Sequence, residues 1–307
     1  MRWLRTLRST QPRNQAGEEM APAVPGPDFM CIGLQKAGTR WLYQQLRMHP
    51  DFWMPPIKEL HFFDKRFESE RGLEKIRRES ERASQKVRNG SATPIESKDY
   101  LFFQLVASRG QDQLSLDWYE CLFDPKGALI SGDITPAYSI LQEHTIKEIH
   151  SRFPKMKVIL LLRDPVERLW SQLCMQWRRN EISAEDLSDR DWVRARVLTR
   201  SAHIERMYPT KIWRRWGTSF EPQNMGFWFL EDIAGAPLDT VSSIVEFIGG
   251  SPVSELKLGV NTKASDKKLK LSEYVRAELA QILDEELTAC ATLFGSHALS
   301  WREKYSE

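Results

Sequence analysis

The sequence predicts an α/β fold with three layers, in which helices cover both faces of a central parallel β-sheet. Short apolar runs bounded by turn residues, as expected of buried parallel strands, occupy residues 28–34, 128–134, 157–162 and 225–230. Helical patterns lie between or after these runs, at residues 39–48, 145–153, 165–179, 238–248 and 271–294. Strands that alternate with helices indicate parallel crossover units.

The first strand and the first helix are joined by a short loop. The run DFMCIGL at residues 28–34 is apolar throughout its centre and breaks at Gly33. The helix that begins near Thr39 ends before Pro50, because the residue before a proline disfavours the helical conformation. The third strand, KVILLL, leads into a helix with Asp164 as its N-cap residue, and Glu167 is placed to complete a capping box. The fourth helix is stopped by Gly249 and Gly250.

Length and composition favour one folded domain that follows a tail. The chain has 307 residues, of which 41% are hydrophobic and 28% charged, as in ordinary globular proteins. Residues 11–27 hold four prolines and two glycines and show no apolar period. We therefore expect a flexible N-terminal tail over residues 1–27 and a single domain over residues 28–307.

A highly charged insertion covers residues 65–98. Glu alternates there with Arg and Lys at helical spacing, and no continuous apolar stripe runs through it. Two interpretations stay open, a solvated surface helix with its own ion pairs or an insertion that overhangs an acceptor site. The first is the more common outcome for such a stretch.

Charge and cysteine usage limit the class of protein. Lys and Arg number 44 against 42 Asp and Glu, which is too balanced for a protein that binds duplex nucleic acid. The apolar runs are too short to span a bilayer. The four cysteines have neither zinc-ligand spacing nor disulfide density, which favours a reducing, cytoplasmic location. Because the first 15 residues hold four arginines and no acid, organelle targeting is a minor alternative.

The most informative residues form a glycine loop between the first strand and the first helix. Gly33 and Gly38 are five positions apart, which predicts a P-loop-like cradle whose backbone N–H groups and helix N-terminus bind a phosphate group. A Walker A loop needs Lys and then Ser or Thr directly after its second glycine. Here Thr39 follows Gly38 and the lysine lies inside the loop, as Lys36. This arrangement disfavours a nucleoside triphosphatase.

Several motifs in order resemble the sulfotransferases that use 3′-phosphoadenosine 5′-phosphosulfate, or PAPS, and in particular their heparan-sulfate-type and bacterial branch. The sequence GLQKAGTRWL is similar to the loop that binds the 5′-phosphosulfate. The other similar motifs are KELHFFD at residues 58–64, GDITPAYS at 132–139, RDPVERLWSQ at 163–172 and FLEDI at 229–233. The resemblance extends from about residue 28 to residue 301, nearly the whole chain.

The resemblance implies a donor site and an activity. It assigns donor binding to Gln35, Lys36, Ala37, Gly38, Thr39, Arg40, Trp41, Arg163 and Ser171. Relatives often have a second hydroxyl residue where this chain has Arg40, so one expected phosphate contact is either lost or replaced by the guanidinium. The stretch at 261–270 is only loosely similar to the basic loop that closes over the nucleotide in relatives.

Sulfuryl transfer requires that the leaving phosphate be neutralised and that the acceptor lose a proton. We expect Lys36 to stabilise the leaving phosphate and Glu59 to be the general base, a role that the resemblance also assigns to it. Hydrophobic neighbours should raise the pKa of Glu59, whereas an ion pair with Lys58 or Arg40 is the alternative. In a strand His61 would share a face with Glu59, and it could orient the acceptor or be the base itself.

Arg163 follows a buried strand, at the sheet edge where ligands bind in open α/β folds, and a planar guanidinium suits the 3′-phosphate of the donor. Ser171, two helical turns further on, could add a hydroxyl to the same phosphate or bond to its own helix. Tyr138 is a candidate acceptor contact. The tryptophans at 170, 177, 213 and 216, which alternate with arginines, are more simply core residues than a groove for carbohydrate.

The sequence thus predicts a sulfotransferase that moves the sulfuryl group of PAPS to a hydroxyl or amine, on a carbohydrate or other small-molecule acceptor. Adenosine 3′,5′-bisphosphate would be the other product, and no metal is expected. The alternative is a P-loop kinase-like enzyme that binds a nucleoside triphosphate. Its support is the glycine spacing together with Asp133 and Asp164, which end apolar runs as a Walker B aspartate does. A non-enzymatic nucleotide-binding scaffold is disfavoured by Glu59.

Overall fold

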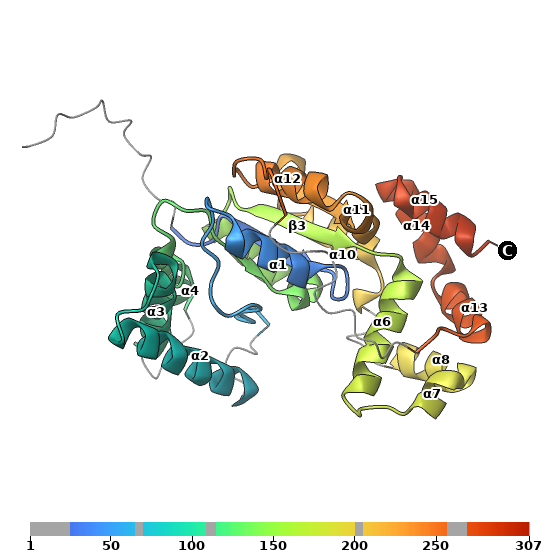
Figure 1. The fold of residues 1–307 in the computed structure, drawn as a ribbon. Coiled ribbons are helices and arrows are strands. Elements are labelled where there is room, and N and C mark those ends of the chain that lie inside the picture. Colours follow the sequence, from blue (N-terminus) through green and yellow to red (C-terminus); the bar gives the residue numbers. More distant parts are fainter. Residues whose placement is uncertain (1–24, 65–69, 109–114, 200–204, 257–268, 307) are drawn as a thin grey trace, which may run out of the picture.

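The computed structural model describes residues 25–64, 70–108, 115–199, 205–256 and 269–306. Its centre is a four-stranded parallel sheet in the order β2–β1–β3–β4 (Figure 1). The strands are β1 (Phe29–Gly33), β2 (Gly132–Ile134), β3 (Lys157–Leu162) and β4 (Met225–Phe229). Residues 29–33 of β1 are buried, and in β3 only Lys157 is partly exposed, as expected of strands in the middle of a covered sheet.

Helices cover both faces of this sheet, which confirms the predicted three-layer α/β fold. Helix α12 (Pro237–Phe247) lies on one face, where its Phe247 meets Trp228 of β4 at 5.3 Å between ring centroids. The next residue back along β4, Phe227, points to the opposite face and meets Trp213 of α10 (Pro209–Trp216) at 5.4 Å. On the first face α12 also contacts α1 (Thr39–Met48), and on the second α10 contacts α5 (Glu143–Arg152).

The remaining helices extend the domain at both ends of the sheet. In Figure 1 α2, α3 and α4 lie together on one side of the sheet, and α6, α7, α8 and α13 lie on the other. Their bounds are α2 (Glu70–Arg88), α3 (Pro94–Ala107), α4 (Leu116–Cys121), α6 (Pro165–Arg178), α7 (Ala184–Ser188), α8 (Arg190–Thr199), α11 (Leu230–Gly235), α13 (Glu273–Ile282), α14 (Asp284–Phe294) and α15 (His297–Lys304). Three short 3₁₀ turns are η1 (Asp124–Lys126), η2 (Pro136–Ile140) and η3 (Pro222–Asn224).

Two predicted elements differ from the observed ones. The second strand was expected over residues 128–134, but β2 begins only at Gly132, because η1 and the left-handed Gly127 form a turn in which the Leu129 N–H bonds to the Lys126 carbonyl at 3.1 Å. The helix expected over 271–294 is two helices, α13 and α14, which change direction at Leu283. Helices α3, α4, α7, α8, α10, α11 and α15 were not predicted.

The tryptophan side chains pack as predicted for core residues. Trp216 is fully buried and stacks on Phe220, and Trp170 is 7% exposed. The cysteines are free thiols, three of them buried. In the described part of the chain no helix is both long and apolar enough to cross a membrane. The expected N-terminal tail falls almost wholly outside the described residues.

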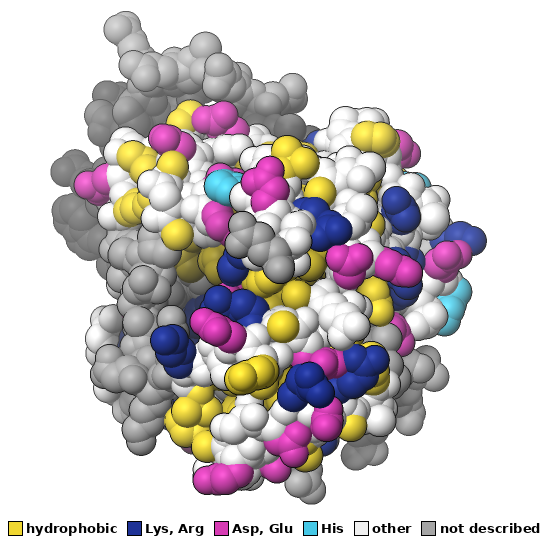
Figure 2. Space-filling view, turned by 90° about the vertical axis from the view of Figure 1, so that its right-hand side faces the viewer, with side chains coloured by type: hydrophobic (Ala, Val, Ile, Leu, Met, Phe, Trp, Pro, Cys, Tyr) yellow, Lys and Arg dark blue, Asp and Glu magenta, His cyan; other side chains and the backbone are white. Residues whose placement is uncertain are grey.

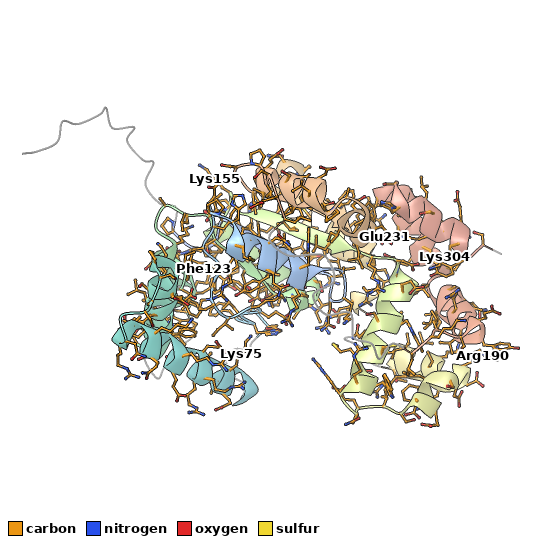
Figure 3. The ribbon with its side chains drawn as sticks, in the orientation of Figure 1. Lys75, Phe123, Lys155, Arg190, Glu231 and Lys304 are labelled. Carbon is orange, nitrogen blue, oxygen red and sulfur yellow. The ribbon has the colours of Figure 1, made fainter. Side chains whose placement is uncertain are left out.

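Helix α15 is tied to the start of α6 by polar contacts around Asp164. One Asp164 oxygen accepts the N–H groups of Val166 and Glu167 at 2.9 and 3.3 Å, so the predicted N-cap is confirmed. The other oxygen accepts the Tyr305 hydroxyl at 2.7 Å and the Lys304 ammonium at 3.1 Å. The Glu167 side chain also bonds to Lys304, at 3.1 Å, and does not close the expected capping box. Figure 3 shows Lys304 at this end of the fold.

Candidate active site

The glycine loop between β1 and α1 has the form of an anion cradle. Lys36 and Gly38 both have left-handed backbone angles, with φ of 73° and 100°. A side chain at Gly38 would place its Cβ 2.9 Å from Ile233, so the loop requires glycine there. The first helical bond runs from Leu42 N–H to the Gly38 carbonyl, which leaves the N–H groups of residues 38–41 without an acceptor in the helix. These groups and the helix dipole favour an anion.

Lys36 lies in a group of cations. Burial lowers its pKa, and the positive charges of Arg178, Arg163 and Arg179 lower it further. Arg163 donates from Nη1 to the Lys36 carbonyl at 3.0 Å. Within the described residues the Lys36 ammonium has no hydrogen-bond or ion-pair partner. A half-buried lysine among arginines is unfavourable unless an anion joins them, and the loop supplies the place for one.

Of the two residues predicted for the 3′-phosphate, only Arg163 makes a side-chain hydrogen bond among the described residues. Arg163 directly follows β3, as expected, and its guanidinium lies against the phosphate loop. Burial lowers its pKa, and the nearby Glu167 and Asp164 oppose that effect. Ser171 is half-buried in α6, and its hydroxyl bonds to no described residue, so the expected alternative of a helix serine bonded to its own backbone is not observed.

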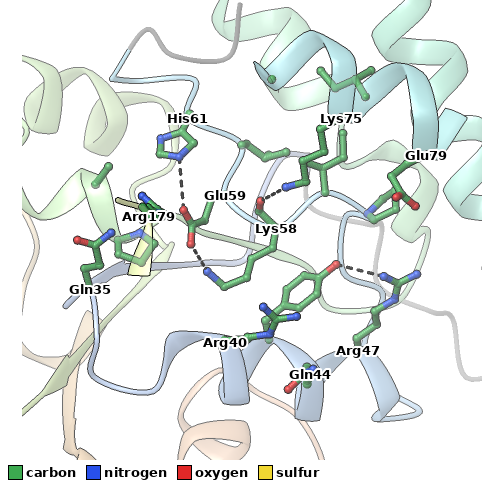
Figure 4. Close-up of a pocket in the computed structure, with 18 of the residues that line it drawn as sticks. Gln35, Arg40, Gln44, Arg47, Lys58, Glu59, His61, Lys75, Glu79 and Arg179 are labelled. Atoms are coloured by element: carbon green, nitrogen blue, oxygen red, sulfur yellow. Dashed lines mark hydrogen bonds and ion pairs between the residues drawn. The ribbon is translucent and has the colours of Figure 1, made fainter. Parts of the chain in front are cut away.

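A cavity of about 700 Å³ joins the phosphate loop to the predicted base. Gln35 and Arg40, on either side of Lys36, line it together with Glu59 and His61 (Figure 4). Four of the predicted site residues, two from the loop and first turn of α1 and two from the 58–64 segment, therefore meet in one place. Lys36 itself is not among the lining residues and lies beside the cavity with Arg163.

Glu59 has two partners in this cavity. Its Oε1 is 2.5 Å from Lys58 Nζ, and its Oε2 is 3.4 Å from His61 Nε2. The other ring nitrogen of His61 is 2.9 Å from Asp64 Oδ2. The segment is not a strand, since Glu59 and His61 both have left-handed angles, with φ of 66° and 59°. The two side chains meet because the backbone turns at each of them, and such unfavourable angles in bulky residues are concentrated at functional sites.

The predicted rise in the pKa of Glu59 is wrong. Burial does raise the pKa, but the hydrogen bonds and charges of His61 and Lys58 outweigh burial and lower it to about 2. Of the two ion-pair partners considered from the sequence, Lys58 is the one observed. Glu59 is therefore a carboxylate at neutral pH, already ionised and held in place.

A buried aspartate supports the segment that carries Glu59, a role that the sequence did not predict for it. Asp133 is 1% exposed and accepts hydroxyl hydrogen bonds from Thr135 at 2.6 Å, Tyr138 at 2.9 Å and Tyr119 at 3.2 Å. The Tyr138 oxygen in turn accepts the N–H of Phe62 at 2.9 Å. Tyr138 is thus fully buried and is a support for the 58–62 loop, not the acceptor contact that was expected.

Replacement of Tyr138 by Phe should lower the free energy of unfolding by about 1 to 3 kcal/mol, because Asp133 and the Phe62 N–H both lose a partner in the interior. Tyr119→Phe removes a single, longer bond to the same carboxylate and should cost less. Urea unfolding of both variants measures the difference. A larger loss for Tyr119→Phe would contradict the role given to Tyr138.

Residues 70–88 of the charged insertion form α2, as the interpretation of a charged surface helix predicts. Its outer face carries ion pairs within the helix, such as Arg77 with Glu74 and Glu81. Its inner face reaches the cavity, which Lys75 and Glu79 line. Lys75 Nζ donates to the Lys58 carbonyl at 2.9 Å, next to Glu59. The helix therefore forms one wall of the candidate site.

Both carboxylates that suggested a triphosphate-binding enzyme are used inside the protein. Asp133 is surrounded by hydroxyl groups, and Asp164 caps α6 and binds Lys304 and Tyr305. Neither is placed to bind a metal ion beside the phosphate loop, as a Walker B aspartate must be. This observation disfavours the kinase-like alternative.

Other cations near the loop were also missed or set aside. Arg178 and Arg179, left out because they alternate with tryptophans, lie near Lys36. Arg168 is fully buried, and burial together with the charges of Arg206 and Arg163 lowers its pKa to about 9. Its Nε and Nη2 have no partner among the described residues. Only the helical spacing of arginines along α6 could have suggested these positions. Most of the 261–270 stretch lies outside the described residues.

The sequence and the fold were compared with those of known proteins. Among curated proteins the chain is similar to carbohydrate sulfotransferase 15 of Mus musculus, with 26% identity over 328 residues that cover 87% of this chain and 55% of that protein. The Homo sapiens protein of the same name is 25% identical over 327 residues, with the same shares covered. The chain thus spans about half the length of these curated relatives.

Among solved structures the chain is similar to a sulfotransferase from Alicyclobacillus acidocaldarius, with a TM-score of 0.61 and 22% identity over 91% of this chain and 100% of that chain. At this identity the likeness supports the α/β fold. The profile of the sulfotransferase family matches residues 27–254, from the start of β1 to beyond α12. Because that match includes the phosphate loop, the Glu59 segment and Arg163, and covers well over half of the chain, the protein belongs to the sulfotransferase family.

Proposed function

We propose that the protein transfers the sulfuryl group of PAPS to a hydroxyl or amine of a carbohydrate. The observation that carries this proposal is the cavity in which the 33–41 loop and Glu59 meet. The donor would lie on the loop, and the acceptor would approach from the side of Glu59. The carbohydrate acceptor is suggested by the names of the curated relatives.

The residues at the loop fit a donor with a phosphosulfate and a 3′-phosphate. Lys36 carries a charge with no partner in the described part of the chain, and the Trp41 indole N–H is buried there without an acceptor. Arg163 adds a planar set of donors at the end of β3. Phosphate and sulfate oxygens would satisfy these groups. The Trp41 N–H is a donor that lacks an acceptor, and Lys36 and Arg163 are cations that lie beside other cations.

In the proposed reaction Glu59 accepts the proton of the acceptor group while the acceptor oxygen or nitrogen forms a bond to sulfur. The bond between sulfur and the bridging phosphate oxygen breaks, and Lys36 neutralises the charge that develops on that oxygen. The products are the sulfated acceptor and adenosine 3′,5′-bisphosphate. His61 and Lys58 hold the Glu59 carboxylate in position, and Asp64 orients His61. No step uses a metal ion.

The experiment that tests this proposal is an isothermal titration of the full chain with adenosine 3′,5′-bisphosphate, beside ATP with Mg²⁺. The bisphosphate should bind without metal and more tightly than Mg-ATP, because Lys36 lies inside the loop and Asp133 and Asp164 are engaged elsewhere. A preference for Mg-ATP would favour the kinase-like enzyme instead.

Replacement of Arg163 by Ala should weaken the bisphosphate by about 2 to 3 kcal/mol, the usual loss for a charge-assisted hydrogen-bonded pair. Adenosine 5′-monophosphate, which lacks the 3′-phosphate, should bind nearly as it does to the wild type. Titration of both nucleotides distinguishes the two effects. Because Arg163 also bonds to the Lys36 carbonyl, equal losses would mean that it acts through the loop and not on the 3′-phosphate.

A further inference from the structure

A second cavity, of about 410 Å³, has Arg163 in its wall and is lined from α6, α11 and α15. Its charged lining residues are three carboxylates and two cations, namely Asp164, Glu167, Glu231, Arg163 and Lys304. Figure 2, which shows the side of the molecule on which α13, α14 and α15 lie, likewise mixes Lys and Arg with Asp and Glu side chains. A guanidinium at this end of the fold therefore has carboxylates close by as alternative partners to a phosphate.

Arg163 nevertheless forms no ion pair within the described ranges of the chain. Its one hydrogen bond there runs from Nη1 to the Lys36 carbonyl, at 3.0 Å. Burial lowers the pKa of Arg163, and the charges of the three carboxylates in the cavity wall oppose that effect. The carboxylates thus lie near the guanidinium without pairing with it. A half-buried guanidinium in this condition is well suited to an anionic ligand.

The two carboxylates nearest to Arg163 in the sequence are bonded to the C-terminal end of the chain instead. Lys304 Nζ lies 3.1 Å from Asp164 Oδ2 and 3.1 Å from Glu167 Oε1. Tyr305, the next residue, donates its hydroxyl to the same Asp164 oxygen at 2.7 Å. One ammonium group therefore holds both carboxylates on the side of α15.

The third carboxylate is held by the same helix. Trp301 Nε1 donates to Glu231 Oε1 at 2.8 Å, and Figure 3 shows Glu231 and Lys304 at this end of the fold. An indole carries no charge, so it fixes Glu231 without offsetting its negative charge. Helix α15 lies beyond residues 27–254, which match the family profile. Of the α15 side chains that hold these carboxylates, Lys304 is the one that carries charge.

We propose that Lys304 is a positioning residue for the donor nucleotide, because it keeps Glu167 and Asp164 from pairing with Arg163. The guanidinium then stays open to the 3′-phosphate, and the donor does not have to break an ion pair when it binds. Without the ammonium, Glu167 would turn to Arg163, the other cation of the cavity wall, whereas Asp164 would stay bonded to Tyr305. The inference rests on the function proposed above, in which Arg163 binds the 3′-phosphate.

Replacement of Lys304 by Met keeps the aliphatic stem and removes the charge. Titration of the full chain should show that adenosine 3′,5′-bisphosphate binds about three- to fivefold more weakly, the usual worth of an ion pair between partly exposed side chains. The affinity for adenosine 5′-monophosphate should stay near that of the wild type, which also shows that the variant is folded. Unchanged binding of the bisphosphate would overturn the inference.

A double-mutant cycle with Glu167 identifies how Lys304 acts. Glu167→Gln alone should hardly alter the binding of the bisphosphate, because in the wild type Lys304 already holds this carboxylate. In the Lys304→Met background the same change should restore most of the lost affinity, since the competing carboxylate is gone. If Glu167→Gln raised the affinity equally in both backgrounds, the two charges would act independently and the inference would be wrong.

A second cycle separates this role from a direct contact between Lys304 and the phosphate. In the Arg163→Ala background, Lys304→Met should cause no further loss of affinity for the bisphosphate, because the proposed effect passes through Arg163. A further loss as large as in the wild type would place the ammonium on the phosphate itself and would contradict the inference.

Arg302→Met is the matched control on the same helix. Arg302 donates to Thr288 and Ser306, at 2.9 Å each, and not to the carboxylates beside Arg163. Its loss should leave the affinity for the bisphosphate unchanged. A decrease equal to that of Lys304→Met would mean a general effect of changes in α15 and would remove the role given to Lys304.

The two proposals fail in different ways. If the wild-type protein does not bind the bisphosphate without metal, the proposed function fails. If it binds the bisphosphate, and Arg163→Ala weakens that nucleotide alone while Lys304→Met does not, only the inference about Lys304 fails.

Discussion

Lys36→Ala should lower turnover by about 10² to 10³, the usual effect of removing a donor that stabilises developing charge. The affinity for adenosine 3′,5′-bisphosphate should fall as well, because in the proposed reaction the ammonium faces the phosphate in the ground state and in the transition state. Steady-state kinetics and titration of the bisphosphate measure the two losses separately.

The same substitution should not destabilise the protein without ligand. Lys36 lies among Arg178, Arg163 and Arg179 with no acceptor in the described residues, so its removal relieves repulsion. The left-handed angle of residue 36 is equally unfavourable for Lys and Ala, and backbone strain is therefore unchanged. Thermal unfolding should show a melting temperature equal to or above that of the wild type. Lys155→Ala, at an exposed lysine, is the control, and a large loss of stability for Lys36→Ala would indicate a structural lysine.

Glu59→Gln should reduce turnover by about 10² to 10⁴, the usual contribution of a general base, while affinity for the bisphosphate stays near that of the wild type. The amide has the shape of the carboxylate but accepts no proton. Glu79→Gln is a matched control, since Glu79 lines the same cavity from α2. Full turnover of Glu59→Gln on a verified acceptor between about pH 6 and 9 would move the base to His61 or to solvent.

The pH profile gives a second check on Glu59. Its pKa is lowered to about 2, so the proposed base is ionised in the free protein over the whole neutral range. The acidic limb of kcat/KM from this group should then lie well below pH 4.5, the ordinary value for glutamate. The stability that the depressed pKa contributes is complete above that ordinary value and is lost as the pH falls toward about 2. An acidic limb near pH 6.5, about the usual pKa of an imidazole, would favour His61 as the base.

The parts of the site that are local in sequence could be predicted. The glycine spacing at 33–38 and the buried strand before Arg163 depend on a few neighbouring residues, and both were placed correctly. The family followed from several motifs in order, and the profile match confirms it.

The electrostatics of the site could not be predicted, because they depend on residues that approach from distant segments. Hydrophobic neighbours suggested a raised pKa for Glu59, but the adjacent Lys58 turns back onto the carboxylate, and left-handed angles bring His61 to its other side. The alternation of hydrophobic and polar residues does not predict such a turn of the backbone. Likewise, the role of Asp133 requires three hydroxyl groups from α4 and from the segment after β2.

The contact between Asp164 and α15 has a consequence for how the protein acquires its activity during synthesis. The phosphate loop is among the first described segments to emerge from the ribosome, whereas Lys304 lies 140 positions after Asp164. Asp164 caps α6 and is next to Arg163 in the sequence. Until α15 and Tyr305 are made, one of its side-chain oxygens lacks the partners that it has in the complete fold. Domains fold during synthesis from the N-terminus, and contacts of long sequence separation form late. We therefore expect nascent chains that stop before α15 to bind the nucleotide poorly, which ribosome-arrested fragments of increasing length would measure.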